Sequence, residues 1–425
     1  FKITGTTLDS GVTLSDNNAT YTSTTSYETI TVDASALTTG IATLNANAEA
    51  DAKVILKGGG GADIITASTS NNLGDTISGN GGADIINIAT GSFTSADTID
   101  GGDGTDVISL SNNSSVVDAD FTNVTSVETL TSASGQQLVA ALDSLASAAG
   151  IDKVILNDTG TTETITVTAG FTNALTVDFD VDTNPNKVVA TAYTGVLTVT
   201  AADTDIDGGA STITGGTGTS DELKVTTTAG LTTIVTTGIT NVEKITTVGA
   251  TGGISMTTAD GLIASGKNLA VDLTSGDDDA NTINAAAETN GTITITADAT
   301  GAHIITLGRG NDSYTHTGAT GISTVVGTRG NNIITTGGGA DIITLGTGTD
   351  TVNSGAGNDI IISTGPSVAL GVTTARNFTS ADVIDGGAGT GAGDTLQLTT
   401  DGMTLVDTDF TNVSNVEVLT TSAVT

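Results

Sequence analysis

Cysteine and tryptophan are absent from this chain of 425 residues, and proline, methionine and histidine occur only twice each. Without cysteine there is no disulfide framework, no thiolate metal site and no cysteine nucleophile. Two histidines leave little scope for a zinc site or for general-base chemistry. Aromatic residues make up only 3% of the chain, so its core must be built from valine, isoleucine, leucine and alanine.

Positive charge is also scarce, because 11 Lys and Arg face 47 Asp and Glu and leave a net charge of −36. A chain this acidic repels phosphate backbones, so we expect no nucleic acid partner. No apolar run approaches the roughly 18 residues of a membrane-spanning helix. The hydrophobic content of 37% nevertheless argues against disorder, since there is apolar surface to bury.

Glycine and threonine, in contrast, are abundant. There are 56 glycines, and threonine supplies about a fifth of the chain. Threonine mixed with valine and isoleucine favours β-structure. Segments 162–170, 174–181, 195–203 and 291–299 alternate apolar residues with Thr or Asp, which predicts strands.

Nine-residue repeats dominate two blocks of the sequence. The first block contains GGGGADIIT at 58–66 and GNGGADIIN at 79–87, and the second runs GTRGNNIIT, TGGGADIIT, LGTGTDTVN and SGAGNDIII from 327 to 362. The sixth positions of the second block are Asn332, Asp341, Asp350 and Asp359. Just upstream, His303 and Asp312 are also nine residues apart.

An apolar residue lies two positions after the acidic or equivalent residue of each repeat, both in the two blocks and at Asp221. The fourteen apolar positions are Ile65, Ile77, Ile86, Ile99, Ile108, Leu223, Ile305, Tyr314, Ile334, Ile343, Val352, Ile361, Ile384 and Leu396. Such regularity predicts a short strand after each turn, with this side chain facing inward.

A larger duplication overlies the small repeat. FTSADTIDGG at 93–102 returns as FTSADVIDGG at 378–387, and DADFTNVTSVETL at 118–130 returns as DTDFTNVSNVEVL at 407–419. A fainter third copy occupies 215–225 and 238–245. Each copy closes with V-E-x-[LI], whose glutamates we interpret as edge or capping residues rather than acid catalysts; they are Glu128, Glu243 and Glu417.

One helix is expected within 134–152, near 136–148. Leu138, Ala141, Leu142 and Leu145 have helical spacing there, and Gly150 is a plausible stop. A weaker helix is expected at 44–52.

The repeat G-G-x-G-x-D-x-U-x, with U a large apolar residue, predicts a coil made of two nonapeptides. Its glycines permit a tight turn whose carbonyls point to one locus, and three strand residues follow. Residues 18 apart then stack at one strand spacing, about 4.8 Å. Asp341 would lie above Asp359, and Asn332 above Asp350.

Stacked carboxylates repel each other by roughly 1 kcal/mol at 4 Å in water, and more where water is scarce. A cation between the turns reverses that sign, and Ca²⁺ suits the site because it accepts six to eight carboxylate and carbonyl oxygens in loose geometry. We therefore predict several bound Ca²⁺ ions, and an unfolded or swollen chain without them. The predicted binding residues are Asp63, Asp75, Asp84, Asp97, Asp100, Asp103, Asp106, Asp312, Asp341, Asp350, Asp359, Asp382, Asp385, Asp394 and Asn332, with the turn glycines Gly59, Gly61, Gly82, Gly102, Gly104, Gly339, Gly348 and Gly357.

Departures from the ideal repeat predict weaker or irregular sites. His303 and Asn332 stand at the acidic position, so their sites should be weak or empty. In the first block the acidic residues are spaced 12, 9, 13 and 9 apart, which predicts inserted residues and irregular coils.

These motifs resemble the RTX family of secreted calcium-binding proteins. The resemblance implies that the repeat Asp and the turn carbonyls bind calcium, here at Asp63, Asp84, Asp106, Asp312, Asp341, Asp350 and Asp359. It also implies export by a type I system to the outside of a Gram-negative bacterium. The rest of the chain resembles, in composition, RTX-type bacterial surface-layer proteins such as that of Caulobacter.

The predicted fold is all-β: calcium-binding parallel β-roll or β-helix blocks joined to further β-solenoid or β-sandwich-like modules. We expect an N-terminal β module at 1–57, a first roll with closing strands at 58–134, and a helix and connector at 135–158. A Thr-rich β module with a degenerate repeat should follow at 159–300, and a second roll, duplicating the first, at 301–425.

The leading functional hypothesis is a secreted structural protein of the cell surface that assembles with itself into a layer or filament. Neither the H-E-x-x-H of zinc proteases nor a G-x-S-x-G nucleophile elbow occurs, so we expect no enzyme in this chain. An adhesin or binding stalk is the alternative, and the repeat region of a secreted hydrolase is less favoured. A cell-surface glycan or lipopolysaccharide is a further expected partner.

Overall fold

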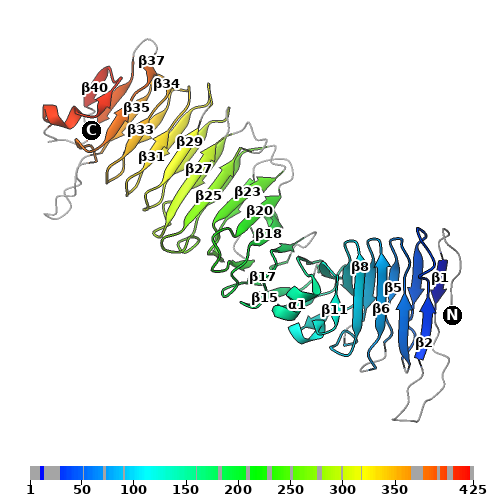
Figure 1. The fold of residues 1–425 in the computed structure, drawn as a ribbon. Helices are drawn as coiled ribbons and strands as arrows, with labels where there is room; N and C mark the ends of the chain where they lie inside the picture. Colours follow the sequence, from blue (N-terminus) through cyan, green and yellow to red (C-terminus); the bar gives the residue numbers. More distant parts are fainter. Residues whose placement is uncertain are drawn as a thin grey trace. The chain divides into compact units, whose positions relative to one another are not determined.

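The computed structural model describes most of the chain in sixteen stretches, and divides it into two compact units. Unit 1 is 1–201 with 210–218, and unit 2 is 202–209 with 219–425. Both are parallel β-solenoids, so the predicted all-β fold is confirmed (Figure 1). The described residues are 10–13, 29–50, 52–69, 73–89, 91–158, 160–179, 184–206, 211–226, 232–248, 252–274, 280–297, 300–316, 318–364, 377–389, 393–399 and 405–421.

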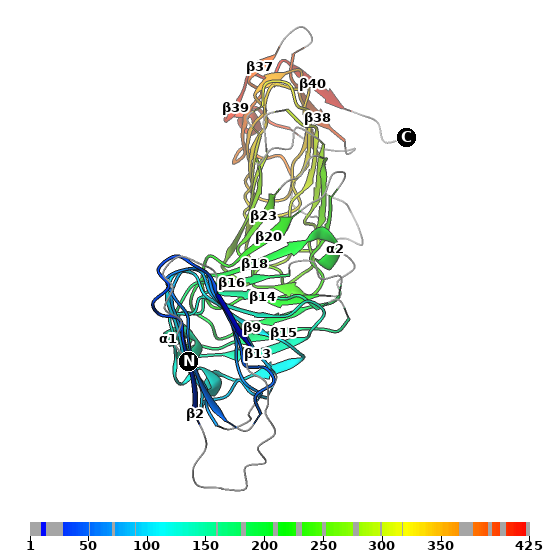
Figure 2. The same ribbon diagram turned by 90° about the vertical axis from the view of Figure 1, so that its right-hand side faces the viewer.

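Unit 1 is built from three parallel sheets. The first contains β2 (Thr29–Asp33), β4 (Lys53–Lys57), β6 (Thr76–Gly81), β8 (Thr98–Asp103) and β11 (Val124–Thr125). The second contains β1 (Ser10–Thr13), β3 (Ala42–Asn45), β5 (Ile64–Thr66), β7 (Ile85–Ile88), β9 (Val107–Leu110), β12 (Thr129–Ser132), β14 (Lys153–Ile155), β16 (Leu175–Asp178) and β18 (Leu197–Ala202). The third contains β10 (Ser114–Val116), β13 (Leu138–Leu142), β15 (Thr164–Val167), β17 (Lys187–Val189) and β19 (Thr212–Thr214). Figure 2 shows β14, β16 and β18 following one another in the second sheet.

Unit 2 has two long parallel sheets. The first contains β20 (Glu222–Thr226), β23 (Lys244–Val248), β25 (Asn268–Leu273), β27 (Thr292–Ala297), β29 (Ser313–His316), β31 (Ile333–Thr335), β33 (Thr351–Asn353), β36 (Val383–Asp385) and β39 (Val413–Ser414). The second contains β21 (Thr232–Val235), β24 (Ile254–Thr257), β26 (Asn281–Asn284), β28 (His303–Thr306), β30 (Ser323–Val326), β32 (Ile342–Thr344), β35 (Ile360–Ser363), β38 (Thr395–Leu398) and β40 (Val418–Thr421). Short strands are β22 (Ile239–Thr240) and the pair β34 (Ala356–Gly357) and β37 (Ala388–Gly389).

The coil period follows the repeat. In unit 2, Ile334 pairs with Val352 and Ile343 with Ile361, so the coils that join these pairs are 18 residues long, as predicted. In unit 1, Ile65 pairs with Ile86, which makes a coil of 21 residues. This longer coil equals the sum of the 12- and 9-residue spacings, so the inserted residues lengthen turns and leave the strand register intact.

The core lies between the sheets of each unit and is filled by one position of the repeat. All fourteen apolar residues that follow the acidic position by two are buried, at 0–2% exposure. In the strands the burial alternates, because successive side chains point to opposite faces. Phe171 and Tyr193 add an edge-to-face aromatic pair, with ring centroids 5.9 Å apart, in the Thr-rich part of unit 1.

The helix expected near 136–148 is shorter than predicted. Leu138–Leu142 form strand β13, and only Ser144–Ala149 form a helix, α1, which ends at Gly150 with φ of 109°. The prediction failed because 138, 140 and 142 also alternate with period two, and the solenoid pairs this segment with β15. The helix expected at 44–52 is wrong, since β3 and a turn occupy its start.

Other helical segments are brief. They are α2 (Asp203–Ile206) and the 3₁₀ turns Asp118–Phe121 and Asp407–Phe410, which occupy equivalent places in the long duplication. No helix within the described stretches is long and apolar enough to cross a membrane.

Candidate metal centres in the aspartate ladders

The repeat aspartates form ladders that run from coil to coil. One carboxylate oxygen of each Asp accepts a hydrogen bond from the backbone N–H of the equivalent residue in the preceding coil. Asp63 N–H donates to Asp84 Oδ1 at 2.7 Å, and Asp84 N–H donates to Asp106 Oδ1 at 2.8 Å. In the second roll, Asp341 N–H donates to Asp359 Oδ1 at 2.8 Å. The predicted stacking is therefore observed, and a charge-assisted hydrogen bond holds each step.

A second ladder runs along the other side of each roll. Asp75 N–H donates to Asp97 Oδ1 at 2.9 Å in the first roll. In the second roll, Asn332 N–H donates to Asp350 Oδ1 at 3.0 Å, and Asp350 N–H donates to Asp382 Oδ1 at 2.7 Å. Each roll thus carries two ladders, one for each nonapeptide of the coil.

Glutamates occupy the last step where the sequence reads V-E-x-[LI]. Asp106 N–H donates to Glu128 Oε2 at 2.7 Å, and Asp394 N–H donates to Glu417 Oε2 at 2.8 Å. These glutamates cap the ladder, as we interpreted them, but the sequence did not lead us to include them among the candidate metal ligands. Their recurrence in the same motif of three internal copies was the available signal.

The second carboxylate oxygen sorts the aspartates into two groups. In the first group it is buried and has no hydrogen-bond partner among the described residues, which is costly for a charged group. An anionic oxygen in such a position fits a cation better than it fits an empty turn. These oxygens belong to Asp84, Asp106, Asp312, Asp341, Asp359 and Asp394.

In the second group both oxygens have partners. The second oxygen of Asp97 accepts from Thr94 N–H at 2.8 Å, and that of Asp382 accepts from Thr379 N–H at 2.7 Å. Local N–H groups also reach Asp63, Asp75 and Asp350, from Gly59, Ser68 and Gly346 respectively. Calcium binding by these five carboxylates stays a prediction, and it would require a cation to compete with these hydrogen bonds.

The remaining predicted carboxylates lie at the rim. Asp100 and Asp103 are exposed, and Thr125 Oγ1 donates to Asp100 Oδ1 at 3.2 Å. Asp385 accepts from Asn415 Nδ2 at 2.6 Å, and this hydrogen bond lowers the pKa of Asp385 below its ordinary value.

Burial raises the pKa of the carboxylates with an unpartnered oxygen. Desolvation raises the pKa of Asp84 to about 7, and the neighbouring charges of Asp63 and Asp106 add to the effect. Desolvation likewise raises the pKa of Asp312 and of Asp359 to about 6. Without a bound cation, the ionised form of these carboxyl groups is therefore destabilised near neutral pH.

Glycines bring carbonyl oxygens to the same carboxylates. A Cβ on Gly79 would lie 2.1 Å from Asp84 Oδ2 and 2.3 Å from Gly101 O, so only glycine allows these oxygens to converge. Gly82 and Gly104 adopt φ of 107° and 144°, which L side chains rarely adopt. Gly102, Gly348 and Gly357 are also left-handed, and Gly59, Gly61 and Gly339 lie against backbone of the preceding coil.

Backbone oxygens must complete any calcium site. Within the described stretches, no three Asp, Glu or His side chains converge closely enough to hold a metal by themselves. Because Ca²⁺ readily mixes carboxylate with carbonyl ligands, the turn geometry fits it, whereas a site built on side chains alone does not form.

The two substituted positions bring no carboxylate. His303 is buried with its ring 4.8 Å from that of His316, and desolvation lowers the pKa of His303 to about 4, so it is neutral. Asn332 donates through Nδ2 to Asp350 Oδ1 at 3.1 Å. Weak calcium binding at these steps stays a prediction.

A family model for the RTX calcium-binding nonapeptide repeat matches the chain four times, at 57–91, 94–114, 317–352 and 326–361. These segments are RTX calcium-binding nonapeptide repeats. The RTX matches include four of the six aspartates with an unpartnered oxygen, which are Asp84, Asp106, Asp341 and Asp359, and they imply that the chain binds Ca²⁺. Searches of curated proteins and of solved structures gave no match, so the likeness to surface-layer proteins stays a prediction.

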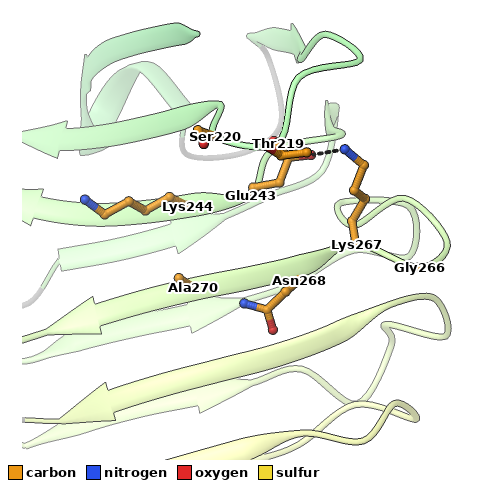
Figure 3. Close-up of a pocket in the computed structure, with 8 residues that line it drawn as sticks. All are labelled: Thr219, Ser220, Glu243, Lys244, Gly266, Lys267, Asn268 and Ala270. Atoms are coloured by element: carbon orange, nitrogen blue, oxygen red, sulfur yellow. Dashed lines mark ion pairs between the residues drawn. The ribbon is translucent and has the colours of Figure 1, made fainter.

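An open pocket of about 420 Å³ lies in unit 2, where the fainter third copy of the long internal duplication closes. The sequence had not indicated it. Lys267 reaches across it toward the buried Glu243, with Nζ 3.8 Å from Oε1 (Figure 3). The pocket is lined by Thr219, Ser220, Glu243, Lys244, Gly266, Lys267, Asn268 and Ala270.

Proposed function

We propose that this chain is a secreted, calcium-stabilised structural protein that assembles with itself at the cell surface. The RTX repeats support calcium binding and secretion by a type I system. The ladders of each roll support this proposal. One oxygen of each Asp binds the neighbouring coil, and in six of the aspartates the second oxygen is buried without a hydrogen-bond partner among the described residues.

Calcium would supply the positive charge that these turns lack. Asp84, Asp341 and Asp359 would hold it through the oxygens that have no hydrogen-bond partner among the described residues, together with turn carbonyls. Extracellular modules bind Ca²⁺ with dissociation constants of about 0.1–1 mM, so their sites fill outside the cell and stay empty inside it. The rolls would then be less stable inside the cell and would reach their full stability after release.

Outward-facing isoleucines support self-assembly. In the motif D-I-I the first Ile points to solvent, and Ile64 and Ile85 are 41% and 40% exposed although they are paired neighbours in the second sheet of unit 1. Val107 continues this row on the next strand. On so acidic a protein, such an apolar row would favour contact with a second copy of the chain.

Calcium removal tests the first part of the proposal. We expect EGTA to weaken the β-type circular dichroism signal of the purified chain, and added CaCl₂ to restore it. If EGTA leaves both the β signal and any polymer intact, the proposal is wrong.

The isoleucine row tests the second part. The double variant Ile64→Thr and Ile85→Thr should fold with calcium as the unchanged chain does, but should remain monomeric in sedimentation and in electron micrographs. Thr76→Ser and Thr98→Ser, on outward positions of the first sheet, provide the matched control and should still assemble. A chain that is monomeric in calcium without any substitution would contradict assembly and favour the adhesin alternative.

A further inference from the structure

The three closing glutamates share one backbone arrangement. The residue two positions before each glutamate is left-handed although it is not glycine: Ser126 has φ of 54°, Asn241 of 55° and Asn415 of 53°. In all three copies the glutamate accepts the N–H of the repeat aspartate in the preceding coil. The same local structure therefore appears three times, and its charges can be compared.

In the first copy, carboxylate and carbonyl oxygens lie close together, and no Lys or Arg among the described residues pairs with the carboxylates. Asp106 Oδ2 is buried without a partner, and the charge of Glu128 raises the pKa of Asp106 further. A Cβ on Gly101 would lie 1.8 Å from Ser126 O and 2.6 Å from Asp106 Oδ2, so the carbonyl and the carboxylate approach the same point. Within the described stretches neither Asp106 nor Glu128 forms an ion pair with Lys or Arg.

The second copy repeats these features. Asp394 Oδ2 is buried without a hydrogen-bond partner. Desolvation raises the pKa of Asp394, and the charge of Glu417 adds to this effect. A Cβ on Gly386 would lie 2.0 Å from Asn415 O and 3.0 Å from Asp394 Cβ. Here too, the described residues contain no Lys or Arg paired with either carboxylate.

The third copy differs by holding a cation of its own. Asp221 N–H donates to Glu243 Oε2 at 3.0 Å, and Lys267 Nζ lies 3.8 Å from Glu243 Oε1 (Figure 3). The third copy also has less negative charge nearby, because Thr214 stands where the first two copies have Asp100 and Asp385. The copy that contains lysine has therefore lost one of the nearby acids.

We propose that Asp106 with Glu128, and Asp394 with Glu417, each hold an additional Ca²⁺ at the closing step of a roll, and that Lys267 replaces this ion in the third copy. The inference rests on the proposed calcium binding and adds ligands outside the nonapeptide. The carbonyls of Ser126 and Asn415 join the two carboxylates, and Ca²⁺ accepts such a mixed oxygen set with water completing it.

The closing site differs from a simple cap in what its charge does. A capping glutamate needs only an oxygen that accepts the aspartate N–H, and the amide oxygen of glutamine can do this. A calcium ligand also needs the negative charge. Glu→Gln substitutions therefore separate the two roles while they keep the side-chain length.

The experiment measures calcium stoichiometry and folding midpoint for the full chain with CaCl₂ alone. Glu128→Gln and Glu417→Gln should each lose about one bound ion by equilibrium dialysis and shift the calcium midpoint, seen by circular dichroism, to higher concentration by about threefold or more. Glu243→Gln is the matched control, and it should leave both the number of ions and the midpoint unchanged.

Lys267→Gln gives the reverse test. Removing the ammonium leaves Glu243 without its counter-ion, so this variant should gain about one bound Ca²⁺. The double variant Lys267→Gln with Glu243→Gln should lose that gain. Because a gain of binding does not arise from misfolding, this arm stays informative if Glu128→Gln folds poorly.

The outcomes separate the two proposals. An unchanged chain that binds no calcium overturns the proposed function itself. An unchanged chain that binds calcium, with Glu128→Gln and Glu417→Gln binding equally many ions at the same midpoint, overturns only the closing sites. Loss of an ion in Glu243→Gln, or no gain in Lys267→Gln, contradicts the replacement by lysine.

Discussion

At the scale of single residues, the repeat aspartate performs two tasks with its two oxygens. Oδ1 accepts the N–H of the preceding coil, so part of the carboxylate is structural whether or not metal is present. Oδ2 is either satisfied by a nearby N–H or left buried without one. Substitutions that change charge while keeping shape therefore have opposite effects in the presence and absence of calcium.

Asp84→Asn tests this division. Asn keeps an oxygen for Asp63 N–H and removes a buried charge, so in EDTA the variant should unfold at higher urea concentration than the unchanged chain. In calcium it should be less stable by about 1–3 kcal/mol, because an anionic ligand is lost. Asp97→Asn, in which both oxygens already have N–H partners, is the control and should be destabilised by similar amounts in both conditions. Equal stability changes of the two variants in EDTA and in calcium would contradict the division of the aspartates into two groups.

The raised pKa values give a pH dependence of the metal-free chain. Because the folded-state pKa of Asp84 is about 7 and its ordinary value is 3.8, the folded state binds more protons between these limits. Stability in EDTA should therefore rise as pH falls from about 8 to 6, by of the order of 1 kcal/mol per pH unit for such a group.

Calcium should reverse this trend, since protons compete with the metal for the same oxygens. Urea unfolding at several pH values, with EDTA and with CaCl₂, measures both slopes. His303 opposes the metal-free trend below about pH 6.5, because its folded pKa is lowered to about 4, and His303→Gln removes this contribution. Equal slopes with and without calcium would count against metal binding by these carboxylates.

At the scale of the element, each turn and strand works only if carbonyl and carboxylate can approach closely. Gly79 and Gly81 lie two residues apart in β6 but have different surroundings. A Cβ on Gly79 would meet Asp84 Oδ2 at 2.1 Å, whereas a Cβ on Gly81 has no neighbour nearer than 3.8 Å.

Gly79→Ala should therefore destabilise the first roll by about 2–4 kcal/mol and weaken calcium binding, because the clash is with backbone and a buried carboxylate. Gly81→Ala should change stability by less than about 1 kcal/mol. Thermal unfolding in CaCl₂ measures both, and a tolerated Gly79→Ala would show that the turn is looser than described.

The nonapeptide pattern predicted much of the element structure. The nine-residue period predicted that two repeats form one coil. The apolar residue two positions after each Asp predicted the core, because side chains alternate between the two faces of a strand. The strand at Leu138–Leu142 was missed, since its spacing satisfies helix and strand alike and only pairing with β15 decides. The hydrogen bonds from Asp63 and Asp84 N–H were also not predicted, because they depend on the side-chain rotamer and not on the period.

At the scale of the whole molecule, calcium dependence should be uneven along the chain. The described part of 138–201 contains no buried carboxylate oxygen without a partner, and its ladder uses Glu163 and Asn186. Its core also contains Phe171 and Tyr193. The two rolls, in contrast, hold most of the buried carboxylate oxygens that lack a hydrogen-bond partner among the described residues.

Amide hydrogen exchange should reveal this difference. In EGTA we expect peptides from 58–110 and 303–398 to exchange at least about tenfold faster than in CaCl₂, while peptides from 138–201 keep their protection. Uniform loss of protection along the chain would indicate that the solenoid unfolds as one cooperative body and that the Thr-rich part depends on its neighbours.

The ladders also have a direction. The donor always belongs to the earlier coil and the acceptor to the later one, up to the glutamate that ends each series. A chain that emerges with its C-terminal end first would thus expose every acceptor before the matching donor arrives. Each newly released coil would meet a carboxylate acceptor that is already in place, so folding would proceed coil by coil from the C-terminal end towards the N-terminal end.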